Sequence, residues 1–153
     1  MVKTAGEQAP EFELKDSEGN LRKLSDFRGQ TIVLYFYPRD NTPGCTTEAC
    51  SFRDAYADFR EAGVEVIGIS PDSERSHASF MAKFELPFIL LSDPDHSVCE
   101  SYGVWGPKKM AGREYEGVYR TTFVIGPDGV IKKVFEKVKP ADHSQEVLAA
   151  VRA

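Results

Sequence analysis

Cysteine is the residue type in this chain best suited to nucleophilic and redox chemistry. Two of the three cysteines, Cys45 and Cys50, lie in one short segment. This segment, Pro38–Cys50, reads Pro-Arg-Asp-Asn-Thr-Pro-Gly-Cys-Thr-Thr-Glu-Ala-Cys. Apolar residues recur at steps of four and three from Cys45 onwards, which predicts a helix of about five turns that ends near Gly63. Cys45 would then lie in the first turn, where unpaired N–H groups and the helix dipole favour the reactive thiolate.

The residues just before Cys45 suit a thiolate site. Thr42 lies three positions earlier and can present its hydroxyl beside the sulfur. Pro38 and Pro43 lack N–H donors and stiffen the loop, while Gly44 lets a small ligand approach the backbone. A simpler interpretation also fits the pattern, because free cysteine is often a small buried residue at a helix start. The local pattern alone therefore leaves a reactive and a structural Cys45 open.

The elements that position this segment form a crossover unit. Thr31–Tyr37 is rich in β-branched and aromatic residues and is stopped by Pro38, which predicts a strand covered on both faces. Val64–Ile69 predicts a second strand after the helix, so the two strands should be parallel with a right-handed connection. Cys45 would follow the carboxyl end of a central strand, the usual place for sites in open α/β sheets.

The rest of the chain predicts one α/β domain over residues 1–153, with the thioredoxin-like fold: a central mixed β-sheet flanked by helices, with an N-terminal β-hairpin. The pattern also fits other small α/β domains. Residues 104–117 are expected to form an irregular polar loop. The other expected elements are the hairpin from Phe12 to Leu24, a helix capped by Ser73, a strand at Phe88–Leu91, a short helix at Asp95–Tyr102, a hairpin of Thr121–Ile125 with Val130–Phe135, and a final helix after Asp142.

Composition excludes several classes of function. The net charge of −5 is spread along 153 residues without a basic stripe, so nucleic acid is not an expected partner. No segment approaches about 20 apolar residues and no leader pattern is visible, so a cytoplasmic protein without membrane contact is expected. Three cysteines are too few for a secreted disulfide framework. The histidines have no paired ligand spacing, and no dinucleotide motif is present, so neither a metal nor a cofactor is expected.

Several motifs resemble those of one family. Pro38-x-x-x-Thr42-x-x-Cys45 matches the peroxiredoxin active-site motif, and Thr-Pro-Gly-Cys-Thr with Cys50 is similar to the bacterioferritin-comigratory-protein, or peroxiredoxin Q, subfamily. The resemblance runs from near Glu7 to near Lys137. Gly126 departs from it, since members often carry an acidic residue there, which affects only a local turn. The further motifs, in the expected order, are Leu91-Ser-Asp, Tyr102-Gly-Val-Trp-Gly and Arg120-Thr-Thr-Phe-Val-Ile.

The resemblance implies a thiol peroxidase that reduces hydrogen peroxide and organic hydroperoxides. It implies that Cys45 attacks the peroxide and that Thr42 and the backbone N–H groups near Gly44 and Cys45 hold it. Arg120 would supply positive charge and also donate to Glu48, with Arg39 and Arg113 as less favoured substitutes. Pro38 completes the implied binding residues. Donors aimed at the departing oxygen would stabilise the transition state more than the ground state.

The resemblance also implies that Cys50 resolves the sulfenic acid of Cys45 as an intramolecular disulfide. In an intact helix the Cα atoms of residues five apart are about 8 to 9 Å from each other, whereas a disulfide needs less than roughly 7 Å. We therefore hypothesise that the first helical turns unwind in each cycle. Cys99 is expected to be buried in a short helix. A bridge from Cys45 to Cys99 stays open as an alternative.

Electrons would come from thioredoxin or a related dithiol protein, again by resemblance, and the protein would be a monomer. The nearest rival is a one-cysteine peroxidase whose sulfenic acid is resolved by an external thiol. A different class is a non-catalytic binding or holdase module in which the cysteines only fill the core. A thioredoxin-type oxidoreductase is disfavoured, because four residues separate Cys45 from Cys50 where that class has two.

Overall fold

A strand of β-branched and aromatic residues lies at the centre of the protein. The computed structural model describes residues 2–152, in which this strand, β3 (Thr31–Phe36), is almost completely buried. It pairs in parallel with β4 (Val64–Ser70) and antiparallel with β8 (Thr121–Ile125). Its side chains are apolar on both faces because both faces are covered. The predicted central strand and its parallel partner are confirmed.

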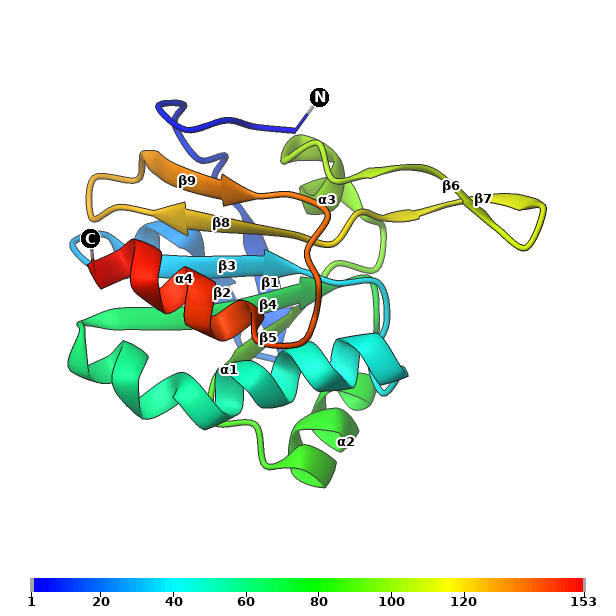
Figure 1. Ribbon diagram of the computed structural model, residues 1–153, viewed down its shortest axis with the longest axis horizontal. Coiled ribbons are helices and arrows are strands. Elements are labelled where there is room, and N and C mark those ends of the chain that lie inside the picture. The colour runs from blue at the N-terminus through cyan, green and yellow to red at the C-terminus, as the bar shows by residue number, and fades with distance from the viewer. Residues whose placement is uncertain (1, 153) are drawn as a thin grey trace.

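Seven strands form one mixed sheet in the order β2-β1-β5-β4-β3-β8-β9 (Figure 1). The predicted N-terminal hairpin is present at one edge, and the predicted C-terminal hairpin of β8 and β9 is present at the other. This mixed sheet with flanking helices is the thioredoxin-like fold that was predicted. The remaining strands of the sheet are β1 (Glu13–Asp16), β2 (Leu21–Lys23), β5 (Ile89–Ser92) and β9 (Ile131–Phe135).

Helices cover both faces of the sheet (Figure 1). Residues of α1 (Pro43–Glu61), α2 (Glu74–Phe84) and α4 (His143–Arg152) pack into the apolar cluster on one face. The short elements η1 (Leu24–Phe27) and α3 (Ser97–Ser101) contribute to the cluster on the other. No helix among residues 2–152 has the length and apolar character needed to cross a membrane.

The start of α1 is set by its sequence. Thr42 is the N-cap residue, and Pro43 occupies the first helical position, where its missing N–H costs nothing. The helix therefore begins two residues before Cys45, which lies in the first turn as predicted. Ser73 caps α2 as predicted, because its side chain accepts the N–H of Ser76 at 3.1 Å.

The expectation of an irregular loop at 104–117 is wrong. Strands β6 (Trp105–Met110) and β7 (Arg113–Val118) form a hairpin that projects from the body (Figure 1). Its turn uses positive φ angles at Ala111 and Gly112. The strand pattern was hidden because the projecting ribbon has little core to face, so most of β7 is exposed and carries no apolar alternation.

Candidate active site

The first turn of α1 holds a buried thiol against a guanidinium group. Cys45 is 1% exposed, and its Sγ accepts a hydrogen bond from Nη2 of Arg120 at 3.3 Å. The N–H of Thr46 donates to the carbonyl of Thr42 at 2.8 Å, and no such bond to a preceding carbonyl is made within residues 2–152 by the N–H groups of Gly44 or Cys45. These two donors are therefore available to an oxygen bound beside the sulfur.

Arg120 reaches the site because β8 begins beside the carboxyl end of its antiparallel partner β3. Thr121 pairs with Phe36, so Arg120 lies where the chain leaves β3 towards α1. Its Nη1 donates to Oε1 of Glu48 at 2.7 Å while Nη2 donates to the sulfur. Burial lowers the pKa of Arg120, but the negative charges of Glu48 and Cys45 outweigh this effect and raise it overall. A permanently charged fork thus connects the thiol to the carboxyl group.

The other two arginines considered for this role do not occupy the site. Arg39 and Arg113 are both exposed, and in the described part of the chain neither of them hydrogen-bonds Cys45 or Glu48. Arg113 lies on the projecting β7 strand. Of these three arginines, Arg120 is the one that contacts Cys45 and Glu48 within residues 2–152.

Gly44 lies close to the guanidinium group of Arg120. A Cβ atom at this residue would lie 3.1 Å from Nη2 of Arg120 and 3.6 Å from Cγ of Pro140. The sequence suggested that Gly44 leaves room for a ligand, whereas in the structure the room is used by the guanidinium group. A side chain here would require Nη2 of Arg120 to shift by a few tenths of an ångström.

Thr42 and Pro38, the other two predicted site residues before Cys45, are both partly exposed. The hydroxyl of Thr42 donates to the carbonyl of Arg39 at 2.9 Å. It makes no side-chain capping bond to α1, and its oxygen still has lone pairs to accept from a further group. A donor on a bound peroxide is one group that this oxygen can accept from.

Glu48 is fully buried and only half satisfied. Its Oε1 receives the Arg120 bond, while Oε2 has no hydrogen-bond partner. Burial raises the pKa of Glu48 to about 7, against the lowering effect of Arg120. Near neutral pH the carboxyl group therefore exchanges a proton, and each protonation changes how much of the Arg120 charge is available to Cys45.

The raised pKa of Glu48 predicts a pH-dependent loss of stability. The pKa is above the reference value of 4.5, so the stability present below pH 4.5 is lost as pH rises to about 7. A shift of this size corresponds to about 3 kcal/mol. We expect Glu48→Gln to remove this loss, so that its free energy of unfolding, measured in urea at pH 5 and pH 8, falls less than that of wild type. Equal falls in both proteins would contradict the prediction.

The two remaining cysteines, Cys50 and Cys99, differ in their exposure. Cys50 lies in the same unbroken helix as Cys45, is half-buried, and lines a hollow of about 560 Å³ between α1 and the start of α4. Cys99 is 0% exposed, as predicted. Burial, followed by the effect of Asp93, raises the pKa of the Cys99 thiol well above its usual range. Cys99 is therefore a poor nucleophile in this conformation.

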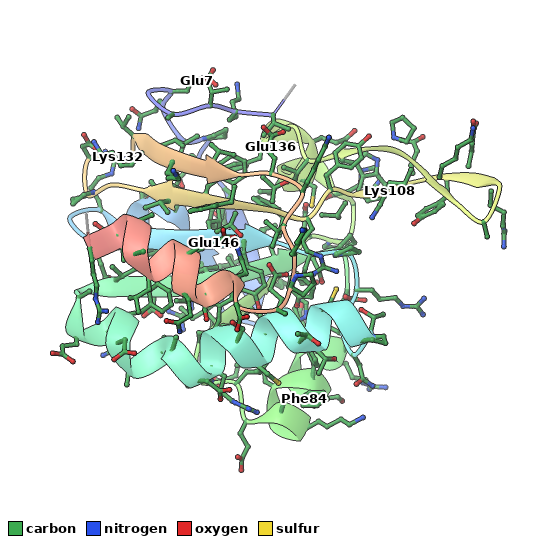
Figure 2. The ribbon with its side chains drawn as sticks, viewed as in Figure 1. Glu7, Phe84, Lys108, Lys132, Glu136 and Glu146 are labelled. Carbon is green, nitrogen blue, oxygen red and sulfur yellow. The ribbon has the colours of Figure 1, made fainter. Side chains whose placement is uncertain are left out.

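Lys108 belongs to the surroundings of the site but was missed by the sequence interpretation. It lies on β6 where the hairpin leaves the body (Figure 2), and its Nζ donates to the carbonyl of Val118 at 2.9 Å. Burial and the nearby Arg120 lower the pKa of Lys108, while Cys45 raises it. No local signal could have revealed this, because the hairpin itself was not predicted.

A buried thiol at a helix start, hydrogen-bonded by a partly buried arginine on a thioredoxin-like sheet, is the arrangement expected of a thiol peroxidase. Residues 5–134 match the model of the AhpC/TSA family. The chain is 51% identical to a putative peroxiredoxin bcp of Coxiella burnetii, over 94% of this chain and 95% of that protein. It is 49% identical to peroxiredoxin Bcp of Bacillus subtilis, over 96% of this chain and 94% of that protein.

Solved structures agree with this result. Peroxiredoxin Q of Xanthomonas campestris superposes with a TM-score of 0.89 at 37% identity, over 99% of this chain and 96% of that one. A further structure from this organism, of its bacterioferritin comigratory protein, has a TM-score of 0.89, 36% identity and the same coverage, and was solved to study alkyl peroxide reduction. The chain therefore belongs to the AhpC/TSA family, as a peroxiredoxin of the Bcp, or peroxiredoxin Q, type. Peroxiredoxins of this type are hydroperoxide-reducing enzymes.

Proposed function

We propose that Cys45 is the residue that attacks the peroxide in this enzyme. The observation that carries the proposal is the Arg120 fork, which joins the buried Cys45 sulfur to Glu48 at the first turn of α1. The thiolate attacks the terminal oxygen of ROOH, the O–O bond breaks, and the RO⁻ group leaves and takes up a proton. Sulfur loses two electrons and becomes a sulfenic acid, and the peroxide is reduced to an alcohol, or to water when R is hydrogen.

The surrounding donors support this step electrostatically. During attack, negative charge moves from sulfur to the departing oxygen. The N–H groups of Gly44 and Cys45 and the Arg120 guanidinium are fixed close to the sulfur before the reaction begins. Donors that need no reorganisation stabilise the charge that develops in the transition state. We assign Thr42 and Pro38 to the walls that hold the peroxide.

We propose that Cys50 resolves the sulfenic acid. Its thiol displaces the sulfenic hydroxyl, which leaves as water, and a Cys45–Cys50 disulfide forms. Because both residues lie in the unbroken helix α1, the helix has to unwind locally before the sulfurs can meet. A half-exposed Cys50 at the rim of a hollow has room for this movement.

Unwinding should be visible by hydrogen exchange. We expect the amides of residues 46–53 to exchange faster, by about tenfold or more, in the peroxide-oxidised protein than in the reduced protein, because the disulfide is incompatible with helical spacing. Mass spectrometry of pulse-labelled peptides measures the difference, with peptides of β3 as the internal control. Equal protection of this segment in both forms would reject the unwinding.

The roles of the three cysteines are tested by mapping the oxidised thiols. After one equivalent of peroxide, we expect tryptic peptides of wild type to contain a Cys45–Cys50 bridge. The bridge should be absent from Cys45→Ser and Cys50→Ser and present at wild-type yield in Cys99→Ser. Mass spectrometry with thiol alkylation reads all four proteins. A stable sulfenic acid in wild type would favour the one-cysteine mechanism, and a bridge to Cys99 would replace Cys50 as resolving residue.

The substrate and the reductant are proposed at the level of chemical class. Because the Xanthomonas campestris protein is described by its alkyl peroxide reduction activity, we propose alkyl hydroperoxides together with hydrogen peroxide as substrates here. A dithiol protein of the thioredoxin type is the proposed reductant, since its two thiols can open the bridge and close their own disulfide in its place. A bridge within one helix requires no second subunit, which agrees with a monomer.

A further inference from the structure

A buried polar cluster lies beside the Cys45 site, between the loop after β3 and the start of α2. Its central pair is Asp40 and His77, with Oδ2 and Nδ1 at 2.7 Å and side chains 3% and 0% exposed. Neither side chain hydrogen-bonds Cys45 or Arg120 within residues 2–152. The peroxide chemistry proposed above therefore leaves this pair without a role.

The hydrogen bonds of His77 define where its protons lie. Nε2 is 2.9 Å from the carbonyl oxygen of Leu91, which can only accept, so Nε2 carries a proton. Asp40 accepts from the hydroxyls of Tyr37 at 2.6 Å and Ser76 at 2.8 Å, as expected for a carboxylate. Nδ1 lies 2.7 Å from Oδ2 of Asp40, so a further proton lies between these two atoms and closes the hydrogen bond of the pair.

Asp40 is also held through its backbone. Its N–H donates to Oδ2 of Asp72 at 2.7 Å, and the same oxygen accepts from the Ser70 hydroxyl at the end of β4. The next residue, Asn41, has a positive φ of 58° and accepts from Lys83 of α2 at 3.3 Å. Residues 40 and 41, which lead directly into α1, are thus tied to β4 and α2.

The position of this loop determines the position of the reacting helix turn. Thr42, the N-cap of α1, follows Asn41 directly, and Cys45 is three residues further on. A loop held at Asp40 keeps the Cys45 sulfur against Arg120. For the sulfur to reach Cys50, the same turn has to unwind, and the loop anchored by His77 is the segment that restrains it.

We propose that Asp40 and His77 are positioning residues that hold the first turn of α1 in its peroxide-reactive conformation and thereby set the ratio between the rates of sulfenic acid formation and disulfide closure. The inference rests on the roles proposed for Cys45 and Cys50. If Asp40 and His77 hold the turn less firmly, sulfenic acid forms more slowly, because the turn is less often in its reactive conformation. The disulfide then closes faster, because the turn unwinds more easily.

Three variants test whether Asp40 and His77 hold the turn, and a fourth controls for a general loss of stability. Asp40→Asn removes the carboxylate. His77→Gln places an amide nitrogen near the position of Nε2 and loses the donor to Asp40, whereas His77→Asn places its nitrogen near the position of Nδ1 and keeps that donor. Asp93→Asn is the matched control, because Asp93 is also a 0% exposed carboxylate that accepts backbone N–H bonds, but it caps α3 instead of the active loop.

Quenched-flow trapping of sulfenic acid and disulfide, well below each variant's Tm, measures both rates. We expect Asp40→Asn and His77→Gln to form sulfenic acid about fivefold more slowly and to close the disulfide about threefold faster, with His77→Asn and Asp93→Asn within about twofold of wild type. Unchanged rates, or two rates that change in the same direction, in Asp40→Asn would overturn the proposal. So would a His77→Asn variant that behaves like His77→Gln.

A second measurement does not depend on the peroxidase chemistry. In the reduced protein we expect the amides of residues 44–50 to exchange about tenfold faster in Asp40→Asn than in wild type or Asp93→Asn. Equal exchange would overturn the anchoring role. If wild type forms no sulfenic acid at Cys45, the proposed function fails, whereas the exchange result still decides whether Asp40 and His77 hold the turn.

Discussion

Cys45→Ser is expected to lose peroxidase activity by about 10³-fold or more, because a serine hydroxyl at the same position is a far weaker nucleophile than a thiolate. Sulfur is also the atom that gives up two electrons to the peroxide, which an alcohol oxygen does not do. The measurement is peroxide consumption with excess dithiol as reductant. Near-isosteric replacement of a buried side chain should leave the fold intact, as circular dichroism and the Tm would show.

Cys99→Ser is the matched control for this prediction. Cys99 is equally buried, but within residues 2–152 no guanidinium group hydrogen-bonds it, and Asp93 opposes its ionisation. We expect its activity to stay within about twofold of wild type when the protein is folded. If Cys45→Ser retained a tenth of wild-type activity or more, Cys45 would not be the attacking residue. Loss of activity in the Cys99 variant alone would identify Cys99, on the other face of the sheet, as the reacting residue.

The secondary structure that lies against the core could be predicted from local pattern. Thr31–Phe36 and Val64–Ser70 are buried strands with mostly apolar residues, and Pro43 and Ser73 mark helix starts by their known preferences. The hairpin of β6 and β7 was not predicted, because a ribbon that projects into solvent has no core to impose alternation. Apolar alternation in a sequence indicates burial, so it does not reveal a strand that is not buried.

At the candidate site, too, features that are local in sequence could be predicted, whereas long-range contacts could not. The position of Cys45 in the first helical turn follows from residues that are neighbours in sequence. Its contact with Arg120 joins residues 75 positions apart, and only the strand pairing of β3 and β8 brings them together. The Asp40–His77 pair spans 37 positions and involves a histidine that sequence alone placed in a helix without a partner. Contacts of this kind depend on tertiary structure and have no local signal.

Removal of the guanidinium group should have the second largest effect. We expect Arg120→Met to lower kcat/KM for peroxide by about 10² to 10³-fold, as found when a preorganised donor is lost from an oxyanion site. Arg120→Lys should recover only part of this loss, because one ammonium group cannot reproduce the planar fork that reaches both Cys45 and Glu48. Steady-state peroxide reduction measures all variants, and Arg113→Met, which removes an exposed arginine, should match wild type.

The loss of Arg120 has a structural consequence that has to be separated from its catalytic one. In Arg120→Met the buried Glu48 is left without its partner, which destabilises the protein and raises the pKa of the carboxyl group further. The double variant Arg120→Met/Glu48→Gln removes this buried acid, so we expect its stability to recover while the peroxide reaction stays slow. Recovery of the rate together with stability would show that Arg120 acts only by neutralising Glu48. A slow reaction in a stable double variant would show that the positive charge acts on the reacting sulfur and the departing oxygen.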